Sequence, residues 1–114
     1  MLVMISQPMN GRTNLDIKNE RAEVIEKFNK LHIAVLDTVF EEEAPENCNK
    51  GAWYLAKSID AMSKVDAVYF MKDWQNARGC RIERQVAKEY GIKILDYDFL
   101  YGEAKVKRLI PEHN

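Results

Sequence analysis

The segment DAVYFMKDWQNARGCRIE, at residues 66–83, constrains the fold of this chain more than any other. Its apolar part predicts a buried strand over residues 65–71, its polar centre predicts a turn, and a helix is expected to begin at Gly79. Free backbone N–H groups at a helix start attract anions, and Arg78 carries a planar guanidinium suited to phosphate or carboxylate. This arrangement predicts a binding site for a phosphorylated small molecule.

Glu83 is the unusual residue of this segment. Apolar residues at helical spacing predict the buried face of the helix, namely Ile82, Val86 and Tyr90. Glu83 lies beside this stripe, where the helix dipole is expected to keep its carboxylate ionised. It either pairs with one of the neighbouring arginines, Arg78, Arg81 or Arg84, or faces the anion site and serves a function. Trp74 is likewise either a lid over the core or a platform on which a base stacks.

Composition limits the class of protein. A chain of 114 residues forms one domain, and a net charge of −1 argues against binding to a nucleic-acid polymer. Cys48 and Cys80 lack the spacing of metal ligands, so we expect free thiols, a reducing compartment, and neither a metal nor a cofactor. The apolar N-terminus is too short for a signal peptide or a membrane span. We therefore expect a cytoplasmic protein.

Strands and helices alternate along the chain. Strands are predicted at residues 2–6, 32–40, 65–71 and 92–97, and helices at residues 15–31, 51–63 and 79–90. Gly91 is the expected end of the third helix. This alternation predicts an α/β fold, a Rossmann-like parallel sheet in the flavodoxin-like order 2-1-3-4, with helices on both faces in three layers.

Ligands of such sheets bind at the loops that follow the strands. The loops in question are residues 6–12, 37–39 and 72–79, and the candidate ligand-binding residues in them are Ser6, Gln7, Met9, Asn10, Gly11, Arg12, Asp37, Asp73, Trp74, Arg78 and Gly79. The tail, residues 98–114, carries apolar residues such as Leu109 and Ile110. It either packs on the domain or on a second subunit, or is a frayed end.

Two motifs carry a family resemblance. ISQPMNG at residues 5–11, with Asp66, Trp74 and ARGCRIE at residues 77–83, resembles the nucleoside 2-deoxyribosyltransferase-like superfamily, more narrowly a small branch of unknown function from bacteria and their phages. The similarity spans residues 2–97, so we expect a domain at residues 1–97. The resemblance implies that Glu83 attacks the anomeric carbon of a nucleoside or nucleotide, that Gly79 admits the sugar or phosphate, and that the protein is a homodimer.

The chain departs from the superfamily at other catalytic positions. It has Met4 in place of a Tyr, Gln7 in place of a Gly, Ser58 in place of an Asp, and Ala77 in place of an acidic residue. A general acid typically contributes about 10²–10⁴-fold to the rate. Without one, a neutral nucleobase is a poor leaving group, whereas the cationic nicotinamide of NAD is not.

Three function hypotheses follow. The first is a protein that binds a nucleotide, a nucleoside phosphate or an ADP-ribose-like signal without rapid turnover. The second is an N-glycosidase or deoxyribosyltransferase with Glu83 as nucleophile, so the sequence leaves open whether the protein is an enzyme. The third is a partner-binding module without a small-molecule ligand.

Overall fold

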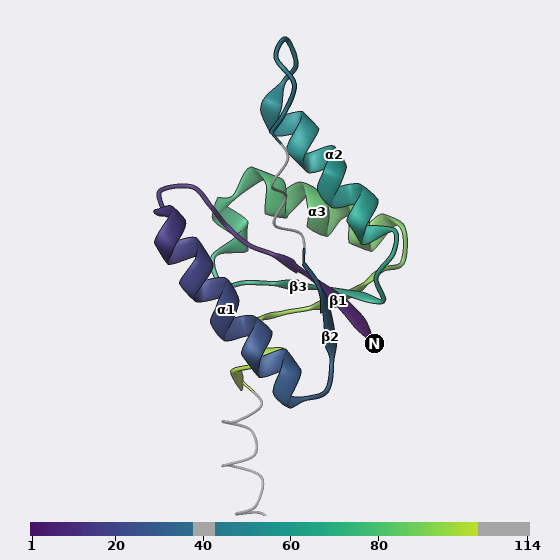
Figure 1. The fold of residues 1–114 in the computed structure, drawn as a ribbon. Helices are drawn as coiled ribbons and strands as arrows, with labels where there is room; N and C mark the ends of the chain where they lie inside the picture. The colour runs from purple at the N-terminus through teal and green to yellow at the C-terminus, as the bar shows by residue number, and fades with distance from the viewer. Residues whose placement is uncertain (38–42, 103–114) are drawn as a thin grey trace, which may run out of the picture.

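The computed structural model describes residues 1–37 and 43–102, and its centre is a parallel sheet (Figure 1). Four strands lie in the order β2-β1-β3-β4: β1 is Leu2–Ser6, β2 is Ala34–Leu36, β3 is Ala67–Phe70 and β4 is Lys93–Leu95. Each neighbouring pair runs parallel. The predicted α/β fold class and strand order are confirmed.

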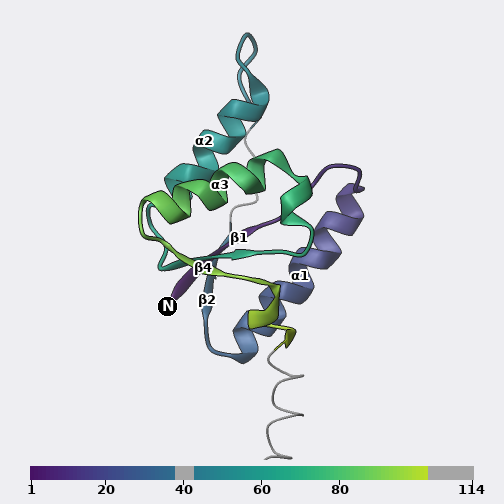
Figure 2. The ribbon, with the colours of Figure 1, turned by 180° about the vertical axis from the view of Figure 1, so that it is seen from behind.

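Helices cover both faces of this sheet, as Figures 1 and 2 show from opposite sides. Helix α1, Asn14–Lys30, lies on one face, and α2, Lys50–Met62, lies with α3, Arg78–Glu89, on the other. Because β1 and β3 are covered on both sides, their side chains are apolar in an almost continuous run and buried throughout β3.

Alternate residues of β3 divide the core into two clusters. Tyr69 packs on the α1 side, where its ring meets Phe28 edge to face with 5.3 Å between the centroids. Phe70 and Val68 pack on the other side, with Met62 of α2 and Ala87 of α3. The period of two along the strand therefore sets which helix each side chain contacts.

Local sequence explains where the helices begin and end. Thr13 and Asp16 form a capping box at the start of α1, and the Asn49 side chain accepts a hydrogen bond from the Ala52 N–H at the start of α2. Gly91 has φ = 69°, and the next residue, Ile92, donates its N–H to the Ala87 carbonyl at 2.9 Å. The expected glycine end of α3 is thus present.

Two sequence expectations about α3 need correction. Helix α3 begins at Arg78, one residue before Gly79. Of its predicted buried face, Val86 packs against the core, but Ile82 is 38% exposed and Tyr90 is 80% exposed. Instead the buried residues of α3 are Cys80, Glu83 and Ala87.

The second strand and the tail are described only in part. Strand β2 is shorter than the predicted 32–40, and residues 38–42, which include the end of that prediction, lie outside the described residues. Phe99 and Leu100, at the beginning of the tail, pack against the core on the α1 side. Residues 103–114, with Leu109 and Ile110, also lie outside the described residues. Within the described ranges, no helix is long and apolar enough to cross a membrane.

Candidate functional site

A cavity of about 1250 Å³ lies where β1 and β3 end. Its walls come from the loop after β1, from α1, and from the first turns of both α2 and α3. This volume exceeds the range that is usual for small-molecule sites, about 300–1,000 Å³. Parallel sheets bind ligands at this edge, so the cavity is the candidate functional site.

Seven of the predicted site residues line this cavity. They come from the loop after β1 and from α3: Ser6, Gln7, Met9, Asn10, Arg78, Gly79 and Glu83. The two motifs, residues 6–10 and 78–83, lie far apart in the sequence and therefore meet at one place in the fold.

Glu83 is the buried acidic group of the site. Its residue is 7% exposed, and its Oε1 accepts a hydrogen bond of 2.6 Å from the Ser6 hydroxyl at the end of β1. The Ser58 hydroxyl of α2 also donates a hydrogen bond to this carboxylate. Ser58 is one of the positions at which the chain departs from the superfamily pattern. It thus contacts Glu83, the residue that the resemblance implies to be the nucleophile.

Two of the three neighbouring arginines have other partners. Arg81 donates to the Gln75 carbonyl at 2.8 Å, and Arg84 binds the Asp96 carboxylate at 2.7 Å. Of the two interpretations of Glu83, the ion pair with an arginine is therefore not found among the described residues. Glu83 faces the cavity instead.

Burial controls the protonation of Glu83. Loss of water raises the pKa of this carboxyl group, and the hydrogen bonds from Ser6 and Ser58 oppose that rise. The helix dipole, which was expected to keep Glu83 ionised, is the smaller influence, because Glu83 lies beyond the first turn of α3. Burial also raises the pKa of the neighbouring Cys80 thiol to about 11, so this thiol is protonated at neutral pH.

The start of α3 opens into the cavity without a cap. Its N-cap residue is Ala77, and no side chain caps the helix, in contrast to α1 and α2. Gly79 lies in this first turn, where an added Cβ would meet no protein atom within 4 Å. The Arg78 guanidinium approaches Gly51 at the start of α2, with Nη2 3.8 Å from where a Gly51 Cβ would be. The two helix starts therefore converge at the cavity.

Basic side chains also line the cavity. In the described part of the chain they are Lys18 and Arg21 of α1 and Arg78 and Arg81 of α3. Arg21 is only 5% exposed and forms an ion pair of 3.4 Å with Asp37, although burial lowers its pKa. Arg21 was not among the site residues predicted from the sequence. The sequence pattern that could have identified Arg21 is the apolar helix face formed by Ile17, Val24 and Phe28. Arg21 is a charged residue that interrupts this face.

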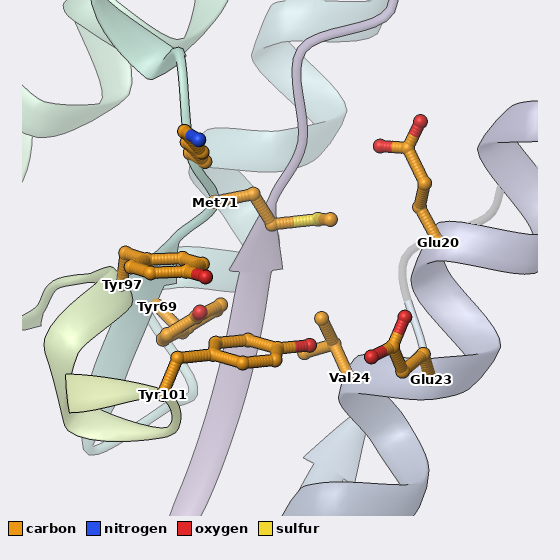
Figure 3. A pocket seen from close by; sticks show the side chains of 8 residues that line it. Glu20, Glu23, Val24, Tyr69, Met71, Tyr97 and Tyr101 are labelled. Carbon is orange, nitrogen blue, oxygen red and sulfur yellow. The ribbon is translucent and has the colours of Figure 1, made fainter. Parts of the chain in front are cut away.

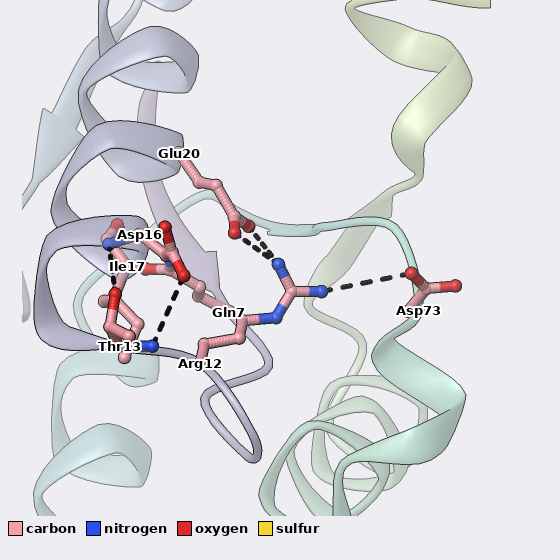
Figure 4. A network of polar contacts seen from close by, with 7 residues as sticks. All are labelled: Gln7, Arg12, Thr13, Asp16, Ile17, Glu20 and Asp73. Carbon is pink, nitrogen blue, oxygen red and sulfur yellow. Dashed lines mark hydrogen bonds and ion pairs between the residues drawn. The ribbon is translucent and has the colours of Figure 1, made fainter.

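Five predicted ligand-binding residues do not line the cavity: Gly11, Arg12, Asp37, Asp73 and Trp74. Figure 4 shows Arg12 between Glu20 of α1 and Asp73, which follows β3. The Arg12 guanidinium hydrogen-bonds to the Glu20 carboxylate and lies 3.9 Å from Asp73. Arg12, in the loop after β1, therefore lies between two carboxylates of opposite charge. Its contact with Asp73 links this loop to the loop after β3.

The remaining residues have structural surroundings. Gly11 has φ = 73° in the turn before α1, a conformation that favours glycine. Trp74 is half-buried over the core, with its ring centroid 6.0 Å from that of Phe70. The Arg84 guanidinium lies 4.2 Å from the Trp74 ring centroid and also binds the Asp96 carboxylate. Of the two interpretations of Trp74, this position corresponds to the lid.

Sequence comparison adds the family. A family model described as a domain of unknown function (DUF4406) matches residues 1–96. The chain belongs to this family. Comparisons with curated proteins and with solved structures gave no match. The family match covers β1 to β4 and with them the residues of the cavity, so the cavity belongs to the family domain. Across the described residues there is no group of three or more His, Cys, Asp or Glu side chains that could hold a metal ion.

The raised pKa of Glu83 predicts a pH-dependent stability difference. A carboxyl group with a higher pKa in the folded state binds more protons there, so the free energy of unfolding falls as pH rises from the ordinary value of 4.5 through the folded value. Glu83→Gln removes this titration. We expect the variant to gain stability relative to the wild type as pH rises through that window, as measured by urea unfolding. A constant difference across pH would contradict the burial argument.

Proposed function

We propose that this protein binds a nucleotide or a related nucleoside phosphate in the cavity and does not turn it over rapidly. The observation that carries the proposal is the charge of the cavity walls. Among the described lining residues, Glu83 is the one carboxylate, whereas four are basic: Lys18, Arg21, Arg78 and Arg81. Such walls favour an anionic ligand and offer no second carboxyl group as a general acid.

The start of α3 supports a phosphate at Arg78 and Gly79. Uncapped N–H groups and the helix dipole favour an anion there, and the Arg78 guanidinium can donate two hydrogen bonds to phosphate oxygens. Gly79 supports the same location. A glycine inside a helix costs about 1 kcal/mol relative to alanine. At this position no neighbouring protein atom would exclude a side chain, so packing does not explain the glycine. The close approach of a ligand would explain why residue 79 is a glycine.

Two polar groups support a sugar in the same cavity. Glu83 lines the cavity beyond the first turn of α3 and offers carboxylate oxygens to ligand hydroxyls. The Gln7 side chain donates from Nε2 to the Ile17 carbonyl at 2.9 Å, whereas its buried Oε1 has no hydrogen-bond partner among the described residues. A hydroxyl or amino group of the ligand would satisfy this acceptor after a small movement of the wall.

A second candidate function is an N-glycosidase with Glu83 as nucleophile. It is favoured by the hydrogen bond between Ser6 and Glu83, which fixes one carboxylate oxygen at the cavity wall. A neutral base would need a general acid to protonate it as it leaves. The two candidates for this acid, Asp37 and Asp73, do not line the cavity. Turnover would therefore be restricted to ligands whose leaving group is already cationic, such as nicotinamide.

From the same superfamily resemblance we also propose a homodimer. Helix α2 projects beyond the rest of the domain in Figures 1 and 2, and Ala52 and Ala56 on it are exposed. A stable interface over this helix would need to bury about 1,000 Å² or more in total. Light scattering at micromolar concentration distinguishes a dimer from a monomer.

Arg78→Ala is expected to weaken binding of a nucleoside monophosphate by about 1.5–3 kcal/mol, the range for a hydrogen bond to a charged group. The unphosphorylated nucleoside should lose far less affinity. Calorimetric titration of both ligands measures the difference. Lys88→Ala is the matched control, because it removes a positive charge from the exposed end of the same helix. Equal losses for both ligands would assign Arg78 another role.

Gly79→Ala is expected to separate stability from binding. The free energy of unfolding should rise by about 0.5–1 kcal/mol, because alanine favours the helix and its Cβ meets no protein atom. The affinity for the nucleoside monophosphate should fall, because the Cβ then occupies the space that the phosphate approaches. Urea unfolding and calorimetry test the two effects on one variant. Unchanged affinity would argue against a phosphate at this helix start.

Glu83→Gln distinguishes the binder from the glycosidase. A binder returns its nucleotide chemically unchanged after long incubation, and the substitution alters affinity only. In a glycosidase, the substitution abolishes release of the base while leaving binding nearly intact, because covalent attack needs the carboxylate. Chromatography of the incubated ligand measures release. We expect no rapid release from nucleotides with neutral bases, and rapid release by the wild type would overturn that expectation.

A further inference from the structure

A second cavity, of about 230 Å³, lies between α1 and the residues that follow β4. Figure 3 shows three tyrosines, Tyr69, Tyr97 and Tyr101, on one side of it and two acidic residues of α1, Glu20 and Glu23, on the other. It shares no lining residue with the larger cavity. Its small volume limits an occupant to a molecule below the usual size of a drug-like ligand.

The Tyr69 hydroxyl is the first indication of a ligand. Tyr69 has no exposed surface, and its hydroxyl has no hydrogen-bond partner in residues 1–37 and 43–102. A buried hydroxyl without a partner is unfavourable, and native proteins rarely leave one. Tyr69 belongs to the lining of the cavity, so a ligand with a hydrogen-bonding group could satisfy its hydroxyl.

The aromatic rings are the second indication. Tyr97 and Tyr101 stack with 4.5 Å between their centroids and 9° between their planes. The Lys27 ammonium already lies 4.7 Å from the Tyr101 centroid. Aromatic faces attract cations in this way, and cages of such rings bind ammonium groups in other proteins.

The charges around the cavity are the third indication. Burial raises the pKa of Tyr101 to about 12, and the hydrogen bond that its hydroxyl donates to Glu23 contributes. Burial raises the pKa of Tyr69 as well, and the negative charges of Asp96 and Asp98 contribute. Glu20 is already bound to Arg12. The opposing charges are those of Lys72, an exposed residue of the lining, and of Lys27 beside the Tyr101 ring.

We propose that this cavity is a binding site for a small organic cation, an alkylamine or a short diamine. One ammonium group would donate hydrogen bonds to the Tyr69 hydroxyl and the Glu23 carboxylate, and the apolar side chains of Val24 and Met71 would contact its alkyl chain. The larger cavity has basic walls and the smaller one has acidic and aromatic walls, so the two select ligands of opposite charge.

The test is calorimetric titration of the whole chain with 1,4-diaminobutane and with 1,4-butanediol, a neutral molecule of similar size. We expect saturable binding of the diamine and none of the diol. Glu23→Gln should weaken the diamine about tenfold or more, since it removes a charged acceptor. Glu23 is exposed, so this variant keeps the fold. Tyr69→Phe should weaken binding several-fold and raise the melting temperature, because an unsatisfied hydroxyl is removed.

Glu26→Gln is the matched control. It removes the same charge from the same helix, but Glu26 faces solvent, pairs with Lys30 at 3.6 Å and does not line the cavity. Its affinity for the diamine should stay within about twofold of the wild type, as expected for a surface charge. The proposal is overturned if the diamine gives no saturable binding, if the diol binds as well, or if Glu26→Gln weakens binding as much as Glu23→Gln.

Discussion

The parallel pairing of β1 with β2 and β3 is the constraint on which the rest of the structure depends. A strand buried on both faces needs helices on both sides, and parallel neighbours need crossover connections that return the chain to the same edge. The ends of β1 and β3 therefore lie together. Ser6 and Glu83, 77 positions apart in the sequence, form a hydrogen bond at that edge.

Two residues at this edge are poor choices for folding alone. A carboxylate is costly to bury, and two hydroxyl donors compensate the loss of water at Glu83 only in part. Gly79 weakens the first turn of α3 without a steric need. Residues that reduce stability are expected where a protein binds its ligand. Both residues line one cavity, beside basic side chains, and this coincidence adds to the support that the charge of the walls gives to a phosphorylated ligand.

The order of strands was predictable from the sequence because alternating elements and right-handed crossovers allow few arrangements. The buried face of α3 was not. Large apolar residues at helical spacing predicted the wrong face, because small ones, Cys80 and Ala87, face the core next to Glu83. The ion pair of Arg12 with Glu20 depends on how the loop after β1 turns at Gly11, which no sequence period reveals. Arg21 was detectable, since it interrupts an apolar stripe of α1.

The most direct test of a phosphate at the start of α3 is a titration of the ¹⁵N-labelled protein with a nucleoside 5′-monophosphate, followed by amide chemical shifts. Binding as proposed would shift the amides of Arg78, Gly79 and Cys80 most, together with that of Ser6 across the cavity. Saturation should occur at one equivalent per chain. Unchanged spectra, or shifts confined to residues away from these helix starts, would contradict the account.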